Sequence, residues 1–146
     1  MSSFFDSMSI SSTGLAAQRL RMNILSGNLA NANTTRTPEG GPYRRKDVIF
    51  SAVPSKKSFE NYLDRDFGTQ LKEVKVVQIH EDTRNPREVF NPSPPDADAK
   101  GIVEMPNIHI MSEMVNMIAA TRSYEANSTA LNAAKQMALK ALEIGR

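Results

Sequence analysis

Hydrophobic residues recur at intervals of seven along the first third of the chain. The main stripe consists of Met8, Leu15, Met22 and Leu29, with Leu25 and Ala32 on an adjoining track, and a second face carries Ala17, Leu20 and Ile24. Apolar positions that return after three, four and seven residues fall on one side of an α-helix. The pattern therefore predicts a helix over about residues 9–32.

The same spacing returns at the other end of the chain. Its members are Ile110, Met117, Tyr124, Leu131 and Ala138, with Met114, Val115, Ile118 and Leu142 beside them. They predict a second helix over about residues 110–143. At 1.5 Å per residue this helix is about 50 Å long.

The segment between the helices has a different pattern. All eight prolines lie between Pro38 and Pro106, and proline inside a helix removes a hydrogen bond and clashes with the preceding turn. Alternating and β-branched residues predict strands at 43–50, 73–81 and 101–105, with loops at 51–70 and 91–101. The predicted fold class is α+β, with a small β-rich unit inserted between long N- and C-terminal helices. The predicted regions are residues 1–35, 36–106 with a variable loop at 51–72, and 107–146.

A polar cluster is expected to end the first helix. Gly27 is followed by Asn31, Asn33, Thr34 and Thr35. Asparagine tolerates the left-handed backbone conformation, and its amide competes for the backbone groups of the last turn.

Composition offers little to catalysis or metal binding. The chain has no cysteine, which removes disulfides, thiol catalysis and thiolate metal sites, and its net charge is only +2. His80 lies beside Glu81 and Asp82, but a surface histidine on an edge strand is the better interpretation, because no further ligand stands out. The stretch DADAKG at 96–101 begins like a calcium loop, yet Asn107 stands where the bidentate glutamate belongs. We therefore predict no catalytic residue, no metal and no cofactor.

A basic cluster leaves one other class of function open, the binding of nucleic acid. Its members are Arg36, Tyr43, Arg44, Arg45 and Lys46. Four cations and one aromatic ring make a weak nucleic-acid footprint, and a solvated or interface loop is the better interpretation. A small nucleic-acid-binding or enzymatic module on residues 36–106 remains the remote alternative.

The helical stripes allow two interpretations. They could form the core of an ordinary small domain. However, polar residues interrupt them at Gln18, Asn28, Thr121, Asn127, Ser128 and Lys135, and alanine is frequent in the second helix. Small residues let helices approach closely, and buried amides fix the register between them. This favours helices that pack against the helices of other subunits.

Three long stretches resemble one known family. They are GLAAQRLRMNILSGNLANANTTRTPEGGPYRRKDVIF, PPDADAKGIVEMPN and EMVNMIAATRSYEANSTALNAAKQMALKALEIGR. Together they resemble the bacterial flagellar rod and hook family over about residues 8–50 and 73–146. The extension TRTPEGGPYRR favours the proximal part of the rod, and another rod subunit of the same family is the alternative.

The resemblance implies a structural subunit rather than an enzyme. In that family the terminal helices pair as a coiled-coil inner domain and pack with neighbouring subunits into a drive shaft that transmits torque from the motor to the hook and filament. It also implies passage through the flagellar type III export apparatus without a cleaved signal peptide, and a final place in the periplasmic rod of the basal body. Residues 1–30 show no basic segment followed by an apolar run, which agrees with that route.

The resemblance also implies the partners. They are further copies of the chain in a homo-oligomeric rod, other flagellar rod subunits, the base adaptor protein between the rod and the MS ring, and the export apparatus, with the rod cap and the P ring as further candidates. Neither nucleic acid nor a membrane span is expected.

Carrying the family motif onto this chain assigns roles to its residues. Asn28, Asn31, Asn33, Thr34 and Thr35 would cap the first helix, and the Pro38–Pro42 stretch would turn the chain. Tyr43, Arg44 and Arg45 would meet acidic groups of an adjacent subunit. The full set of expected interface residues is Leu15, Met22, Leu25, Asn28, Leu29, Asn31, Asn33, Thr34, Tyr43, Arg44, Arg45, Met114, Met117, Arg122, Tyr124, Glu125, Asn127, Leu131, Met137, Leu142 and Ile144.

Overall fold

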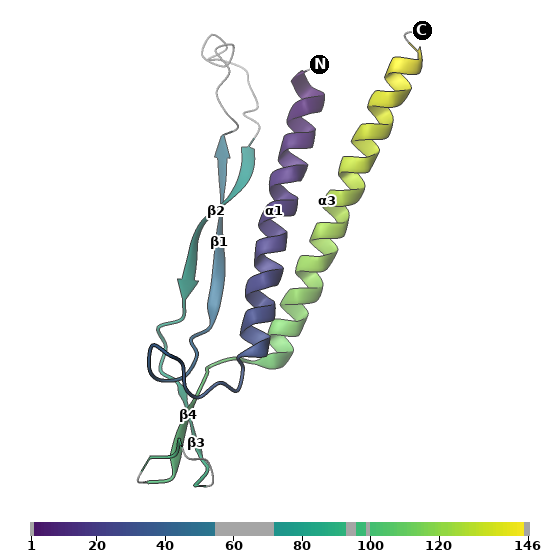
Figure 1. The fold of residues 1–146 in the computed structure, drawn as a ribbon. Helices are drawn as coiled ribbons and strands as arrows, with labels where there is room; N and C mark the ends of the chain where they lie inside the picture. Colours follow the sequence, from purple (N-terminus) through teal and green to yellow (C-terminus); the bar gives the residue numbers. More distant parts are fainter. Residues whose placement is uncertain (1, 55–71, 93–95, 99, 145–146) are drawn as a thin grey trace. The chain divides into compact units, whose positions relative to one another are not determined.

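The computed structural model describes residues 2–54, 72–92, 96–98 and 100–144. Its elements are α1 (Ser2–Ala30), β1 (Lys46–Pro54), β2 (Lys72–Glu81), β3 (Arg87–Phe90), β4 (Ile102–Met105) and α3 (Ile110–Ile144), as Figure 1 shows. A long helix at each end with short strands between them confirms the α+β prediction. The first helix begins seven residues earlier than the hydrophobic stripe indicated.

The strands form two separate pairs. β1 pairs with β2, and β3 pairs with β4 in an antiparallel ladder that runs from Arg87 opposite Met105 to Phe90 opposite Ile102. In Figure 1 the arrows of β1 and β2 also point in opposite directions. The predicted first strand was placed three residues too early, and β3 was not predicted at all. The predicted loop at 51–70 is wrong for Ser51–Pro54, which continue β1, and its remainder lies outside the described residues.

The chain divides into two compact units. Unit 1 comprises Met1–Leu20, Ile49–Gln78 and Thr121–Arg146, and unit 2 comprises Arg21–Val48 and Ile79–Ala120. Within each unit the segments of α1 and α3 run antiparallel and side by side (Figure 1). Both units therefore contain a segment of each helix.

In unit 1 the helices meet at a glycine. A Cβ atom added to Gly14 would lie 2.9 Å from Nδ2 of Asn127, so the amide of α3 rests directly on the α1 backbone. Ser9 donates a hydrogen bond of 2.8 Å from Oγ to Oε1 of Glu73, which ties α1 to β2.

Burial along α3 follows a heptad. Its inward positions alternate by four and three residues and are Glu113, Met117, Ala120, Tyr124, Asn127, Leu131, Ala134 and Ala138. Ile110 was expected on this stripe, but it is 43% exposed. The reason is local, since Asn28 lies opposite Glu113 and the helix α1 ends at Ala30, before it could cover Ile110.

The core that this fold buries is thin. Among the described residues the buried hydrophobic side chains are Ala17, Leu25, Ala32, Val48, Val103, Ile108, Ala120 and Ala134. Half of them are alanines, which bury little apolar area each. Large apolar side chains meanwhile remain exposed on both helices and on β2. None of the described helices has both the length and the apolar composition needed to cross a lipid bilayer.

Candidate functional site

Two of the most completely buried side chains of unit 2 are polar. Asn28 of α1 is fully buried and Glu113 of α3 is 2% exposed, and the two meet through a hydrogen bond of 2.9 Å from Asn28 Nδ2 to Glu113 Oε2. Tyr43, Arg45 and the backbone of Lys46 complete the cluster. We call these five residues the Asn28 network.

The Asn28 amide makes every hydrogen bond available to it. Nδ2 donates to the Lys46 carbonyl at 2.7 Å as well as to Glu113, while Oδ1 accepts from the Lys46 amide at 2.9 Å and from the Tyr43 hydroxyl at 3.2 Å. The side chain thus pairs with Lys46 as a neighbouring strand would, satisfying both backbone groups where β1 begins. An asparagine carries two donors and two acceptor positions on one short side chain, so the residue type follows from the geometry.

Glu113 adds a charge that is balanced inside the unit. Its Oε1 accepts a hydrogen bond of 2.8 Å from Nε of Arg45, and Nη1 of Arg45 lies 3.0 Å from Oδ2 of Asp47. Glu113 lies in the first turn of α3, where the helix dipole favours a negative charge. A buried carboxylate that is both paired and hydrogen-bonded fixes geometry strongly, because removing either partner leaves an uncompensated charge.

The network shifts the pKa values of Arg45 and Tyr43 and of Asp47 beside it. Burial alone lowers the pKa of Arg45, but the hydrogen bonds to Glu113 and Asp47 outweigh it, so this pKa is raised. Burial also raises the pKa of Asp47, yet the hydrogen bonds from Arg45 and from the Val48 amide reverse the effect and the net pKa is lowered. Both groups therefore hold their charges more firmly than they would in water. For Tyr43, burial raises the pKa of the hydroxyl, which stays neutral and donates to Asn28.

At the end of α1 the residues predicted to cap the helix have different roles. Asn31 does cap the helix, since its Nδ2 donates to the Gly27 carbonyl at 2.9 Å. Asn28 instead joins the network, Thr34 bonds to Asn31, and Thr35 donates to Asp96. Among the described residues no side-chain-bearing residue has a left-handed backbone, so the asparagines here do not use the left-handed conformation that they tolerate.

The turn that follows was predicted correctly. The Thr37 amide donates to the Gly41 carbonyl at 2.9 Å, closing a tight loop. Gly40 and Gly41 have φ values of +91° and +76°, which side-chain-bearing residues rarely adopt. The loop delivers Tyr43 and Arg45 into the network and borders a cavity of about 300 Å³ that Arg44, Arg84 and other residues line.

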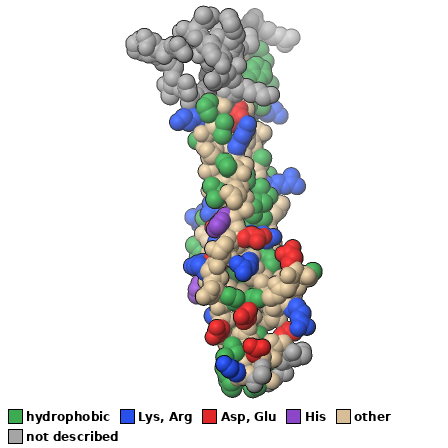
Figure 2. Space-filling model, turned by 90° about the vertical axis from the view of Figure 1, so that its left-hand side faces the viewer, with side chains coloured by type: hydrophobic (Ala, Val, Ile, Leu, Met, Phe, Trp, Pro, Cys, Tyr) green, Lys and Arg blue, Asp and Glu red, His purple; other side chains and the backbone are tan. Residues whose placement is uncertain are grey.

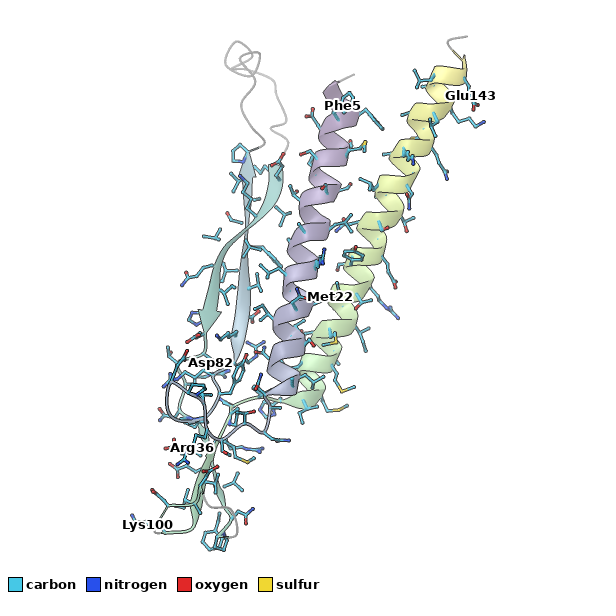
Figure 3. All side chains as sticks on the ribbon, viewed as in Figure 1. Phe5, Met22, Arg36, Asp82, Lys100 and Glu143 are labelled. Atoms are coloured by element: carbon cyan, nitrogen blue, oxygen red, sulfur yellow. The ribbon has the colours of Figure 1, made fainter. Side chains whose placement is uncertain are left out.

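The expected interface residues divide by exposure. Those exposed are Asn33, Arg44, Met114, Arg122, Glu125, Met137 and Leu142. Those partly exposed are Leu15, Met22, Leu29, Asn31, Thr34, Tyr43, Arg45, Met117, Tyr124, Asn127 and Leu131. Leu25 and Asn28 are buried within the chain, so they can support an interface only by holding the surface residues in place. The side chain of Ile144 lies outside the described residues. Figure 3 labels Met22 on α1, at the side that faces α3.

The basic cluster is largely neutralised within the chain. Arg45 pairs with Glu113 and Asp47, Lys46 pairs with Glu81 at 3.1 Å, and Arg36 lies 3.5 Å from Asp96. Acids of its own chain therefore hold Arg45, and its expected contact with acids of another subunit stays a prediction. Figure 2 shows acidic and basic side chains interspersed on the face in view, with no field of one sign for a phosphate backbone to follow.

Sequence reasoning missed Glu113. Its signal was a single acidic residue on the inward side of an apolar helix, three positions into the first turn. In the part of the chain that the structure describes, no group of three or more His, Asp or Glu side chains could hold a metal ion.

Comparison with known proteins decides the family. Residues 8–36 match the family described as flagella basal body rod protein, and residues 99–144 match the C-terminal family described for flagellar basal body rod FlgEFG proteins. The chain is 45% identical to the flagellar basal-body rod protein FlgC of Bacillus subtilis, with 97% of this chain and 98% of that protein covered. It is 43% identical to FlgC of Borreliella burgdorferi, with 96% of each covered, and 40% identical to FlgC of Salmonella typhimurium, with 94% of each covered. The chain belongs to the FlgC family.

Membership in the FlgC family decides between the alternatives left open above. The chain is a structural subunit of the proximal rod of the flagellar basal body, and the FlgC relatives are structural rod proteins rather than enzymes. The Asn28 network is thus a structural site. Its members come from the FlgC-like stretch around residue 28, the turn that follows it, and the start of α3.

Proposed function

We propose that the chain works as a torque-bearing unit of the rod, in which its terminal helices pair as an antiparallel coiled coil and pack against neighbouring subunits. The observation that supports this proposal most directly is the contrast between a thin, alanine-rich core and the large apolar side chains that are exposed on the helices. The latter include Met114, Met137 and Leu142. Such exposure is costly in a lone subunit and is relieved by burial against neighbours, at about 25 cal/mol per Å².

The helix contacts support the pairing. Gly14 meets Asn127 in unit 1, and Asn28 meets Glu113 in unit 2. From the first contact to the second, α1 advances by fourteen residues and α3 retreats by fourteen, which is two heptads. Together with the four-three burial pattern of α3, this repeat is what an antiparallel coiled coil requires.

The proposal also covers the export route of the subunit and the proteins that it assembles with. The chain would leave the cytoplasm through the flagellar type III apparatus and join further copies of itself, other rod subunits and the base adaptor protein of the MS ring. The rod cap and the P ring are further contacts within the same proposal. Arg44 of the basic cluster is exposed and suited to an acidic group of a neighbour.

Motility complementation tests this function. A flagellated bacterium that lacks its own FlgC-family subunit should swim again when supplied with this chain, and its isolated basal bodies should contain it. Replacement of Tyr124 with Ala should leave export intact and reduce swimming, because the side chain lies on the inward heptad of α3. Lys135→Ala is the matched control on the exposed side of the same helix. Swimming at the unmodified level with Tyr124→Ala, or failure of the unmodified chain to enter basal bodies, would contradict the proposal.

A further inference from the structure

One side of the β3–β4 ladder carries two acids and an exposed aromatic ring. Glu88 lies directly opposite Glu104, and Phe90, two positions further along β3, lies opposite Ile102. Register partners and alternate residues share one side of a sheet, so these side chains lie together. The other side of the ladder carries Val103, which is only 4% exposed and belongs to the core. We call Glu88, Phe90 and Glu104, all of them exposed, the ladder face.

The two carboxylates of the ladder face repel each other. Like charges directly opposite in an antiparallel ladder are destabilising, because their Cβ atoms are only about 4.5–5.5 Å apart. Among the residues that the structure describes, no ion pair or side-chain hydrogen bond involves Glu88 or Glu104. The pair therefore lowers the stability of the ladder and supports no polar contact in the described chain.

Basic side chains of the same unit do not neutralise this pair. Arg84 is paired with Asp82, and Arg87 lies on the other side of the ladder. Arg44 and Glu104 border the same cavity, but no ion pair joins them. The negative charge of the ladder face is thus available to a cation from outside the chain.

Phe90 adds an aromatic surface beside the carboxylates. Its side chain is 74% exposed. A Cβ atom added to Gly101, the residue before β4, would lie 3.1 Å from Cε2 of Phe90 and 3.4 Å from Cβ of Pro92. The glycine backbone therefore supports one part of the ring, while the rest of the ring is open to solvent.

We propose that the ladder face receives an arginine side chain of a neighbouring rod subunit. A guanidinium group is planar, pairs with carboxylates through two hydrogen bonds and stacks on aromatic rings, whereas the lysine ammonium is a compact and strongly hydrated charge. Two carboxylates and one ring on the same side of a ladder match that combination, and a bound cation relieves their repulsion. The inference rests on the proposed function, because it names one contact through which the chain joins its neighbours.

Replacing one carboxylate tests the proposal, because it separates stability from assembly. In Glu104→Gln the repulsion is gone, so amide exchange in β3 and β4 of the purified chain should slow by up to about fivefold. The same variant offers only one carboxylate to the arginine of a neighbour. When it competes with the unmodified chain in cells that lack their own FlgC-family subunit, we expect it to enter basal bodies about threefold less often. Glu39→Gln is the matched control at an exposed acid of the same unit and should change neither quantity.

Photo-cross-linking identifies the partner side chain. A photoreactive p-benzoylphenylalanine at position 90 keeps an aromatic ring on the ladder face. Basal bodies that contain this variant are isolated and irradiated, and the cross-linked peptide is identified by mass spectrometry. We expect a cross-link to another chain, either a second copy or a different rod subunit, in a segment that contains an arginine.

The outcomes separate the contact from the function. Slower exchange and reduced incorporation of Glu104→Gln, together with a cross-link to an arginine-containing segment, support the inference. Faster exchange, unchanged incorporation, no cross-link, or a cross-link to a segment without arginine would overturn it. Failure of the unmodified chain to enter basal bodies would instead overturn the proposed function.

Discussion

The two places where α1 meets α3 are built by different physical means. In unit 1 the contact is steric, because a glycine without a side chain lets the Asn127 amide approach the α1 backbone. In unit 2 the contact is polar and charged, because Asn28, Glu113 and Arg45 form a saturated hydrogen-bonded cluster away from water. A steric contact yields when a side chain moves, whereas a buried ion pair fails abruptly when one partner is lost. The comparison predicts that unit 2 is the more brittle and the more rigid of the two.

Removing the buried carboxylate should have the largest effect. Glu113→Ala leaves Arg45, whose side chain is only 19% exposed, without its main partner, and such losses cost roughly 3–5 kcal/mol. Hydrogen exchange should show loss of protection concentrated in residues 21–48. Glu113→Gln is the matched control, because it keeps an acceptor for Asn28 and should cost less. If Glu113→Ala changes protection no more than Glu113→Gln does, the charge is not what stiffens unit 2.

Filling the glycine of unit 1 should have a much smaller effect. In Gly14→Ala the new methyl group would lie 2.9 Å from Nδ2 of Asn127, which must shift but is the far end of a flexible side chain. Alanine also favours a helix over glycine by about 1 kcal/mol, so the change in unfolding free energy should stay within about 1 kcal/mol of zero. The double variant with Asn127→Ala relieves the contact and should exceed the single variant in stability. A drop of several kcal/mol, measured by urea unfolding, would show that the steric contact is as unforgiving as the polar one.

The smallest expected effect concerns an exposed ion pair in unit 2. Hydrogen bonds from the side chain and then from the backbone of Arg84 lower the pKa of Asp82 from 3.8 to about 2. A lowered pKa means that the pair stabilises the fold above about pH 4 and loses that contribution as the pH falls through 2. Arg84 is 69% exposed, so solvent screening keeps the contribution small. Asp82→Asn should flatten the pH dependence of exchange at the 82–84 turn between pH 4 and 2, whereas Asp98→Asn, the matched control, should not.

The helices could be predicted from sequence because a seven-residue apolar repeat is a local signal. Strand β3 could not, because Arg87–Phe90 is only four residues long, directly follows Pro86 and carries no clear alternation. Ile110 was misplaced for a different reason. The repeat puts it in phase with Met117, but only the structure shows that α1 has ended at Ala30 and leaves it uncovered.

The Asn28 network lies beyond what a local pattern can reveal. Asn28 was singled out as an interruption of a stripe, but its partners come from the segment after the turn and from a helix that begins 82 positions later, at Ile110. Arg45 illustrates the limit, because a basic residue in a polar loop looks free until its acid is found. Glu113 supplies that acid 68 positions away.

The separation of Asn28 and Glu113 in sequence also affects when unit 2 can fold. Their contact spans 85 positions, so its closure entropy is paid only after most of the polypeptide is present. A nascent or truncated chain that ends before residue 113 leaves Asn28 and Arg45 without their acid. We expect such a chain to stay flexible and open to proteases until the last quarter of the molecule, which includes Glu113, is present.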